Sequence, residues 1–128
     1  MSPTTVPAMA ADLRRTGRAL LKHALAFPES VLDHPWGEDV VKVNGKVFVF
    51  FGIVEKERLH VTVKLPEAGE FALTFPFAQP SGYGLGKAGW VTSMFGSGDS
   101  PPIDILEDWI EESYRAVAPK RLVRELKG

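Results

Sequence analysis

The 128-residue sequence contains no cysteine and no apolar run long enough to cross a membrane. Without cysteine, disulfide bridges and thiolate metal sites are excluded. The longest apolar stretch, residues 47–51, is far short of the roughly 20 residues that a membrane helix needs, so no membrane partner is expected. The first residues lack the basic segment and apolar run of a secretory signal. These absences favour a cytoplasmic protein.

An excess of either charge is also lacking. Fifteen Lys and Arg side chains stand against sixteen Asp and Glu, which leaves a formal net charge of -1. A protein held on nucleic acid by its overall field usually carries a clear positive excess. The length is that of one domain. We therefore expect a single domain over residues 8–128, preceded by a disordered end at residues 1–7.

The hydrophobic pattern predicts an α+β fold, in which an antiparallel β-meander is flanked by N- and C-terminal helices. Apolar residues at steps of three and four predict a first helix over residues 8–27, which Pro28 stops. Prolines and Gly37 predict a loop over residues 28–39. The other expected elements are a short helix over 66–73, a loop over 76–89, a strand over 90–95, a long helix capped by Asp99 or Ser100 with Pro101 in its first turn, and a short helix over 120–126.

The clearest local signal is Asn44-Gly45, which separates two apolar strands. Asn-Gly suits a type I′ turn because both of its central residues need positive φ. A two-residue turn pairs Val43 with Lys46 and Val41 with Phe48. A third strand over residues 59–65 then follows a polar turn at residues 55–58.

Alternation divides the side chains of these three strands between two faces, provided that the polar turn has four residues. One face is wholly apolar and is expected to be core; it comprises Val41, Val43, Phe48, Phe50, Leu59, Val61 and Val63. The other face is mixed; it comprises Lys42, Val47, Val49, Phe51, Ile53, His60, Thr62 and Lys64. Trp36 is expected to pack its ring against this sheet.

Three patterns that often carry chemistry lack the context they need. Residues 84–89 match G-x-G-x-x-G, but the dinucleotide fingerprint requires a strand before it and a helix after it. The three histidines have no metal-ligand spacing, and no serine lies in a G-x-S-x-G elbow. We therefore expect no cofactor, no metal site and no catalytic residue. The glycine loop with Lys87 remains a candidate for holding an anion.

The order and spacing of several motifs resemble the MmcQ/YjbR family. The motifs are HPWGE at 34–38, VKVNGKVF at 41–48, VKLP at 63–66, GYGLGK at 82–87 leading to WV at 90–91, PIDIL at 102–106, WIEESY at 109–114 and VAPK at 117–120. The resemblance spans roughly residues 12–126. Positions that match the family signatures are Trp36, Gly37, Lys46, Lys64, Tyr83, Lys87, Trp90, Ser113 and Tyr114.

The resemblance implies a small domain in which an antiparallel sheet carries helices, similar to secretion-chaperone-like domains. The family is described as predicted DNA-binding, with a double-wing motif and no established role. This sequence departs from the family at Gly86 and Gly89, where polar residues are common. Any contact that those side chains would make is absent from this chain.

Two functions are compatible with these features. In the first, implied by the resemblance, two hairpin tips with Lys46 and Arg58 act as wings against DNA phosphates. Binding of that kind would be weak and salt-sensitive. A basic ridge on the first helix would add charge; it comprises Arg14, Arg15, Arg18 and Lys22.

In the second, the mixed sheet face is a groove for an anionic small molecule or a protein partner. Lys42, His60 and Lys64 would lie in this groove, with Tyr83, Lys87 and Trp90 along one side. The protein partner could be a peptide helix or a second copy of the chain. A continuous basic patch around both hairpin tips would favour DNA, whereas an enclosed cleft would favour a ligand.

Overall fold

The computed structural model describes residues 5–34, 38–54, 58–82, 88–96 and 98–126. Its centre is a six-stranded antiparallel sheet with strand order β1-β2-β3-β4-β6-β5. The elements are α1 (Thr5–Leu25), β1 (Ser30–Asp33), β2 (Asp39–Val43), β3 (Lys46–Val54), β4 (Arg58–Lys64), α2 (Gly69–Ala72), β5 (Ala78–Pro80), β6 (Trp90–Phe95), α3 (Ile103–Val117), α4 (Lys120–Val123) and a 3-10 turn (Arg124–Leu126). The predicted α+β fold is confirmed.

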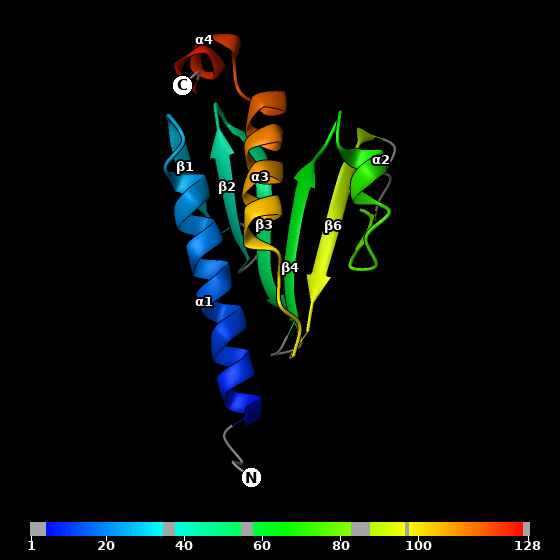
Figure 1. The fold of residues 1–128 in the computed structure, drawn as a ribbon. Coiled ribbons are helices and arrows are strands. Elements are labelled where there is room, and N and C mark those ends of the chain that lie inside the picture. The colour runs from blue at the N-terminus through cyan, green and yellow to red at the C-terminus, as the bar shows by residue number, and fades with distance from the viewer. Residues whose placement is uncertain (1–4, 35–37, 55–57, 83–87, 97, 127–128) are drawn as a thin grey trace.

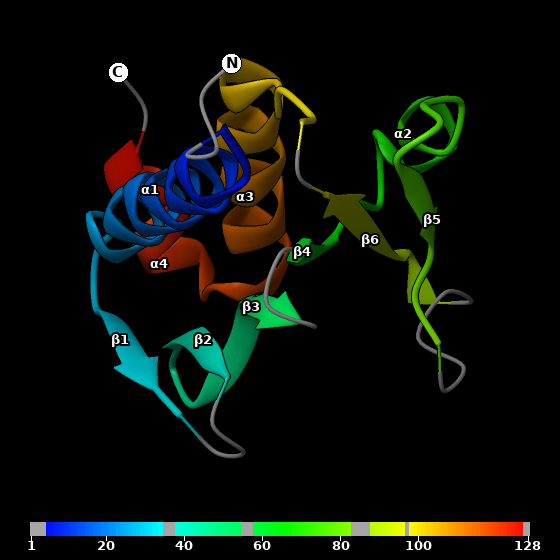
Figure 2. The same cartoon turned by 90° about the horizontal axis from the view of Figure 1, so that it is seen from below.

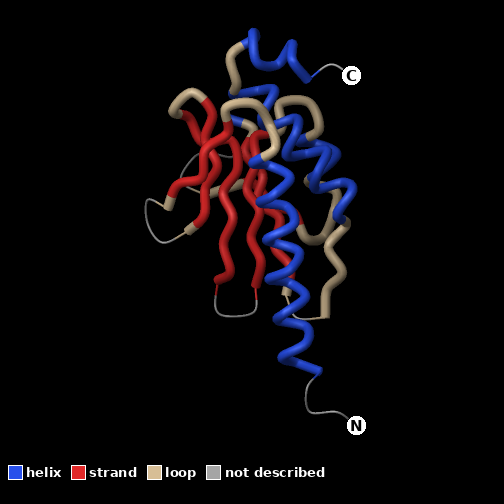
Figure 3. Tube along the Cα trace, turned by 90° about the vertical axis from the view of Figure 1, so that its left-hand side faces the viewer, coloured by secondary structure: helices blue, strands red, loops and turns tan. Residues whose placement is uncertain are grey.

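Two long helices cover one face of the sheet. Helices α1 and α3 lie next to each other on that side, which we call the covered face (Figures 1 and 2). No described helix lies on the opposite side, which we call the open face, and the trace in Figure 3 shows the helices gathered on one side of the strands. Among the described residues, no helix is long and apolar enough to span a membrane.

Helix α1 buries the predicted apolar stripe. Leu13, Leu20 and Ala24 are buried against the sheet and α3. The helix begins at Thr5, three residues before the predicted start. Pro7 falls in the first turn, where the missing backbone N–H has no intrahelical partner to lose.

The predicted type I′ turn is present. Asn44 and Gly45 have φ of 54° and 77°, and Val43 pairs with Lys46. The predicted pairing of Val41 with Phe48 is wrong, because Val41 lies opposite Val49. Between these pairs β3 contains one more residue than β2, which is a β-bulge.

The bulge reverses the predicted faces of β3 beyond Phe48. Val49 and Phe51 are buried in the core, although they were assigned to the mixed face, and Phe50 lies on the open face, although it was assigned to the core. The connection to β4 also differs, since Val54 pairs with Arg58 and only residues 55–57 lie between them. The two shifts offset each other, so β4 has the predicted faces.

Two short strands lie in segments that were predicted to be loops. Strand β1 lies within the predicted loop 28–39, and β5 lies within the predicted loop 76–89. They form the two edges of the sheet. Strands of four and three residues are too short to show a clear alternation, and Pro80 weakens the pattern further.

The start of α3 also differs from its prediction. Pro102 is its N-cap residue and the helix begins at Ile103. Pro101 precedes Pro102, and a residue before a proline rarely adopts helical backbone angles. Asp99 closes a turn instead of capping the helix, since its Oδ2 accepts a hydrogen bond from the Gly96 N–H at 2.7 Å.

Candidate functional site

The open face contains a hollow of about 250 Å³ that forms where β3 carries Gly52. Gly52 lies opposite His60 on β4, and the register of β2 with β3 places Glu38 on its other side. A glycine has no side chain to cover the sheet at this point, and Glu38 and His60 lie on either side of it among the lining residues of the hollow. The hollow is lined by Glu38, Phe50, Phe51, Gly52, His60, Thr62, Ser81, Gly82 and Thr92.

A row of hydroxyl groups forms one side of the hollow. The Thr92 Oγ1 lies 2.9 Å from the Thr62 Oγ1 and 2.9 Å from the Ser81 Oγ. The three side chains are half-buried and come from β6, β4 and the residue after β5. Each hydroxyl has one donor and two acceptor positions, so this row keeps hydrogen-bonding capacity for a bound molecule.

An aromatic pair lies beside the hydroxyl row. Phe50 lines the hollow, and the Trp90 ring meets it edge to face with centroids 5.7 Å apart. The site therefore combines an aromatic wall, a hydroxyl row, a carboxylate and an imidazole. Small-molecule sites in proteins commonly combine an apolar or aromatic wall with a few convergent polar groups. Among the described residues, no cluster of three or more His, Asp or Glu side chains is placed to hold a metal ion.

The predicted open-face residues separate into two groups. His60 lines the hollow, and Trp90 contacts its aromatic wall. Lys42 and Lys64 share the open face but are not among the lining residues. The Nζ of Lys42 lies 2.8 Å from Asp33 Oδ2, so its charge is already paired. The hydrogen bond from Lys42 and the hydrogen bond from the His34 backbone N–H both lower the pKa of Asp33.

The other predicted residues lie away from the hollow or outside the described chain. Lys46 is the exposed first residue of β3, and the exposed Arg58 begins β4 opposite Val54, the last residue of β3. Strand β3 has nine residues and therefore spans about 26 Å at the usual rise. Tyr83 and Lys87 lie outside the described residues, as does Trp36. The basic ridge is exposed on α1, on the covered side of the sheet; it comprises Arg14, Arg15, Arg18 and Lys22.

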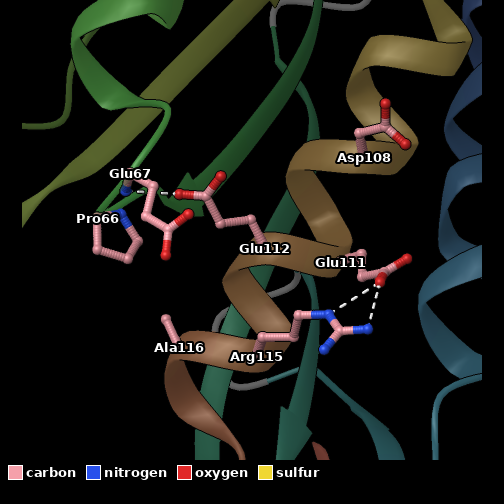
Figure 4. Close-up of a pocket in the computed structure, with 7 residues that line it drawn as sticks. All are labelled: Pro66, Glu67, Asp108, Glu111, Glu112, Arg115 and Ala116. Carbon is pink, nitrogen blue, oxygen red and sulfur yellow. Dashed lines mark hydrogen bonds and ion pairs between the residues drawn. The ribbon is translucent and has the colours of Figure 1, made fainter. Parts of the chain in front are cut away.

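A second hollow, of about 390 Å³, lies between α3 and the chain after β4 and is rich in carboxylates (Figure 4). Most of its charged groups already have partners. The Glu112 Oε2 accepts hydrogen bonds from the backbone N–H groups of Glu67 at 2.8 Å and Ala68 at 3.0 Å. Glu111 pairs with Arg115 one turn along the helix. The polar groups around this hollow therefore connect α3 to the segment just before α2, a contact that we call the joint before α2.

Ser113 and Tyr114, which match the family signature, also bond to backbone groups of other segments. The Ser113 Oγ accepts a hydrogen bond from the Lys64 N–H at 2.8 Å and donates one to the Phe48 carbonyl at 2.5 Å. The Tyr114 hydroxyl donates to the Pro28 carbonyl at 2.7 Å. Burial raises the pKa of the Tyr114 hydroxyl above its ordinary value. Both side chains are fully buried and join α3 to the sheet and to the chain before β1.

A third hollow of about 630 Å³ lies beside α2. Its side-chain charges are the carboxylates of Glu67 and Glu70, and its remaining lining consists of apolar residues and glycines. It lacks the convergent hydroxyl and imidazole groups that distinguish the hollow at Gly52.

Sequence reasoning missed most of the lining of the hollow at Gly52. Thr62 was assigned to the mixed face, and Thr92 has the same parity in its strand as Trp90, so alternation could have suggested both. Ser81 could not be found, because it follows a strand that the sequence did not reveal. Glu38 and Gly52 come together only through the observed register.

Residues 25–116, well over half of the chain, match the sequence model of the YjbR family. This match confirms the resemblance seen in the ordered motifs. A search of curated proteins finds no match to the chain.

Proposed function

We propose that this chain, which belongs to the YjbR family, is a small-molecule-binding domain whose site is the hollow at Gly52 on the open face. The observation that carries the proposal is the convergence of Glu38, His60 and the hydroxyl row on one gap in the sheet. An engineered apolar cavity of about 150 Å³ binds benzene. A hollow of about 250 Å³ therefore has room for one ring with a polar substituent.

The charges of the lining favour a neutral or cationic ligand. Glu38 contributes a carboxylate, and no lysine or arginine is among the lining residues. Lys42, which could have attracted an anion, is paired with Asp33. A ring that donates hydrogen bonds would satisfy Glu38 and the free acceptor positions of the hydroxyl row. The proposed ligand therefore differs from the anion that the sequence suggested.

Three probes of the same ring and different charge test this proposal. Benzamidine, benzamide and benzoate are titrated into ¹⁵N-labelled protein, and the amide shifts of His60, Thr62 and Thr92 are followed by NMR. We expect affinity to fall from benzamidine to benzamide to benzoate. Glu38→Gln should remove the preference for benzamidine over benzamide, whereas Glu70→Gln, a change at an exposed carboxylate on α2, should leave it intact. Tighter binding of benzoate, or no shift near the hollow, would refute the proposal.

Binding of DNA through two wings receives less support from the geometry. Successive turns of a meander lie at opposite ends of its strands, so Lys46 and Arg58 are about 26 Å apart along β3. At this separation, Lys46 and Arg58 do not by themselves form the continuous basic patch that is typical of a DNA-binding surface. A titration of fluorescent duplex DNA at low salt with wild type and Lys46→Ala/Arg58→Ala measures the alternative directly. Salt-sensitive binding that the double variant loses would favour the wings.

A further inference from the structure

The two edges of the sheet differ in how well they are protected against pairing with another strand. Strand β5 is only three residues long and ends in Pro80, which has no N–H to donate. Strand β1 contains no proline, no lysine and no bulge. Its Val31 and Leu32 side chains are 60% and 37% exposed. No described strand pairs with the outer edge of β1, so this edge can accept an additional strand.

The basic ridge lies beside this open edge. At 100° per residue, His23 lies on the flank of α1 that contacts Glu107 of α3, so Arg14 and Arg18 lie on the opposite flank, toward β1. Arg18 is seven residues before the end of α1, or about 10 Å along the helix axis. Asp33 is three residues into β1, or about 10 Å along the strand. The helix and the strand run back along each other from residues 26–29 (Figures 1 and 2).

We infer that the outer edge of β1 binds an extended acidic segment of a partner protein as a seventh strand. Backbone hydrogen bonds to β1 would supply the affinity, as in other cases of strand addition. Two apolar side chains of the partner would cover Val31 and Leu32. Carboxylates on the covered side would reach Arg14 and Arg18, which make no ion pair with another described residue.

The charge of α1 distinguishes this partner from a second copy of the chain. Pairing of β1 with β1 of another copy would place two α1 helices next to each other across the twofold axis. The exposed arginines of the two basic ridges would then repel each other. A partner strand with carboxylates at those positions gains the attraction and avoids the repulsion.

The register of β1 defines the sequence that fits. Leu32 lies on the covered face opposite Val41, and Val31 lies on the open face beside Lys42. A fitting segment has two adjacent apolar residues to cover this pair and carboxylates at the flanking covered-face positions. Opposite Asp33 a neutral residue is required, because a carboxylate there would repel it. For a partner strand that runs antiparallel to β1, the pattern from its N-terminus is acid, neutral, apolar, apolar, acid, as in the pentapeptide Glu-Thr-Val-Val-Glu.

Fluorescence anisotropy with this labelled pentapeptide tests the inference, and the full chain is used. We expect Arg14→Glu/Arg18→Glu to weaken binding at least tenfold. The matched change Lys120→Glu/Arg124→Glu, on the exposed surface of the C-terminal helix and turn, should leave binding within twofold. The Lys-Thr-Val-Val-Lys peptide should bind at least tenfold more weakly than its acidic counterpart. Equal binding of the two peptides, or no loss in the α1 variant, would overturn the inference.

Backbone pairing is tested on the peptide, so the fold of the protein is untouched. Along a strand, successive N–H groups point to opposite sides. Methylating the amide nitrogen of one valine should therefore abolish binding, whereas methylating the other should leave it nearly unchanged. Equal effects of the two methylations would overturn strand addition. Sedimentation that shows a β1-dependent dimer, strengthened in Arg14→Glu/Arg18→Glu, would identify a second copy as the occupant and would also overturn the inference.

This inference is independent of the proposed ligand at Gly52, and the two can fail separately. The hollow lies on the open face, whereas the arginines lie on the covered side of the sheet. Glu38→Gln should therefore leave binding of the acidic peptide unchanged, and Arg14→Glu/Arg18→Glu should leave the benzamidine shifts unchanged.

Discussion

Hydroxyl side chains on the two faces of the sheet have different hydrogen-bond partners. On the covered face, the hydroxyls of Ser113 and Tyr114 bond to backbone groups of distant segments. On the open face, the hydroxyls of Thr62, Thr92 and Ser81 bond to one another. A hydroxyl that satisfies a buried backbone group is needed for the fold, because the unpaired group would lose its hydration without compensation. A half-buried row that bonds only to itself has no such structural necessity.

The comparison indicates which polar residues are available for function. Ser113 and Tyr114 match the family signature, yet their hydrogen-bonding groups are committed to the fold. Glu112 is likewise committed to the joint before α2. Among the described residues, the hydroxyls of Thr62, Thr92 and Ser81 bond to one another and not to backbone groups of distant segments, so they are available to a ligand at the proposed site. Ser113→Ala and Thr92→Val test how sharply the two faces differ, and the larger effect is expected at Ser113.

Ser113→Ala removes a partner from two backbone groups at once. The Lys64 N–H, which is part-buried, and the Phe48 carbonyl, which is buried, would both lose this partner. We expect the free energy of unfolding to fall by about 2–4 kcal/mol, measured by urea denaturation. Ser100→Ala, at an exposed serine, should change it by less than about 0.5 kcal/mol. If the two variants were equally stable, the covered-face hydroxyl would not be structural.

Adjacent carboxylates on α3 offer a second and smaller contrast. Glu112 bonds to two backbone N–H groups, whereas Glu111 pairs with the exposed side chain of Arg115. Glu112→Ala should lower the free energy of unfolding by about 1–2 kcal/mol, and Glu111→Ala by about 0.3–0.5 kcal/mol. Thermal unfolding of both variants measures the difference. A larger loss in Glu111→Ala would show that the joint at Glu67 and Ala68 is unimportant.

Thr92→Val tests the open face with a change that nearly keeps the shape of the side chain. Its hydroxyl links those of Thr62 and Ser81, both of which are half-buried and near solvent. We expect a loss of no more than about 1 kcal/mol in the free energy of unfolding, together with clear loss of the benzamidine-induced NMR shifts. A loss as large as that of Ser113→Ala would remove the proposed difference between the faces.

The smallest effect concerns pH and the exposed ion pairs. The hydrogen bond and charge of Arg121 lower the pKa of Glu29 from its ordinary value of 4.5, and Lys42 acts similarly on Asp33. A lowered pKa in the folded state means that the stabilisation is complete above the ordinary value and is lost as pH falls through the folded value. We expect Glu29→Gln to flatten slightly the decline of the melting temperature below pH 4.5. A steeper decline in the variant would contradict this sign.

Much of the fold followed from local patterns in the sequence. The Asn44-Gly45 turn and the stripe of α1 predict the hairpin and the first helix, because both depend on neighbouring residues. The bulge at Phe48 and the edge strands β1 and β5 escaped prediction, because pairing with a distant strand decides them. The same limit applies to the site. His60 was predicted from alternation, whereas Glu38 and Ser81 reach the hollow only through the tertiary register.

The most direct test of the account is to map the benzamidine-induced amide shifts over the whole sheet. If the open face is the functional one, the shifts cluster at His60, Thr62 and Thr92, and Thr92→Val abolishes them while its unfolding free energy stays within about 1 kcal/mol of wild type. Shifts that cluster instead on the covered face, around Ser113 and Glu112, would contradict the division of roles between the two faces.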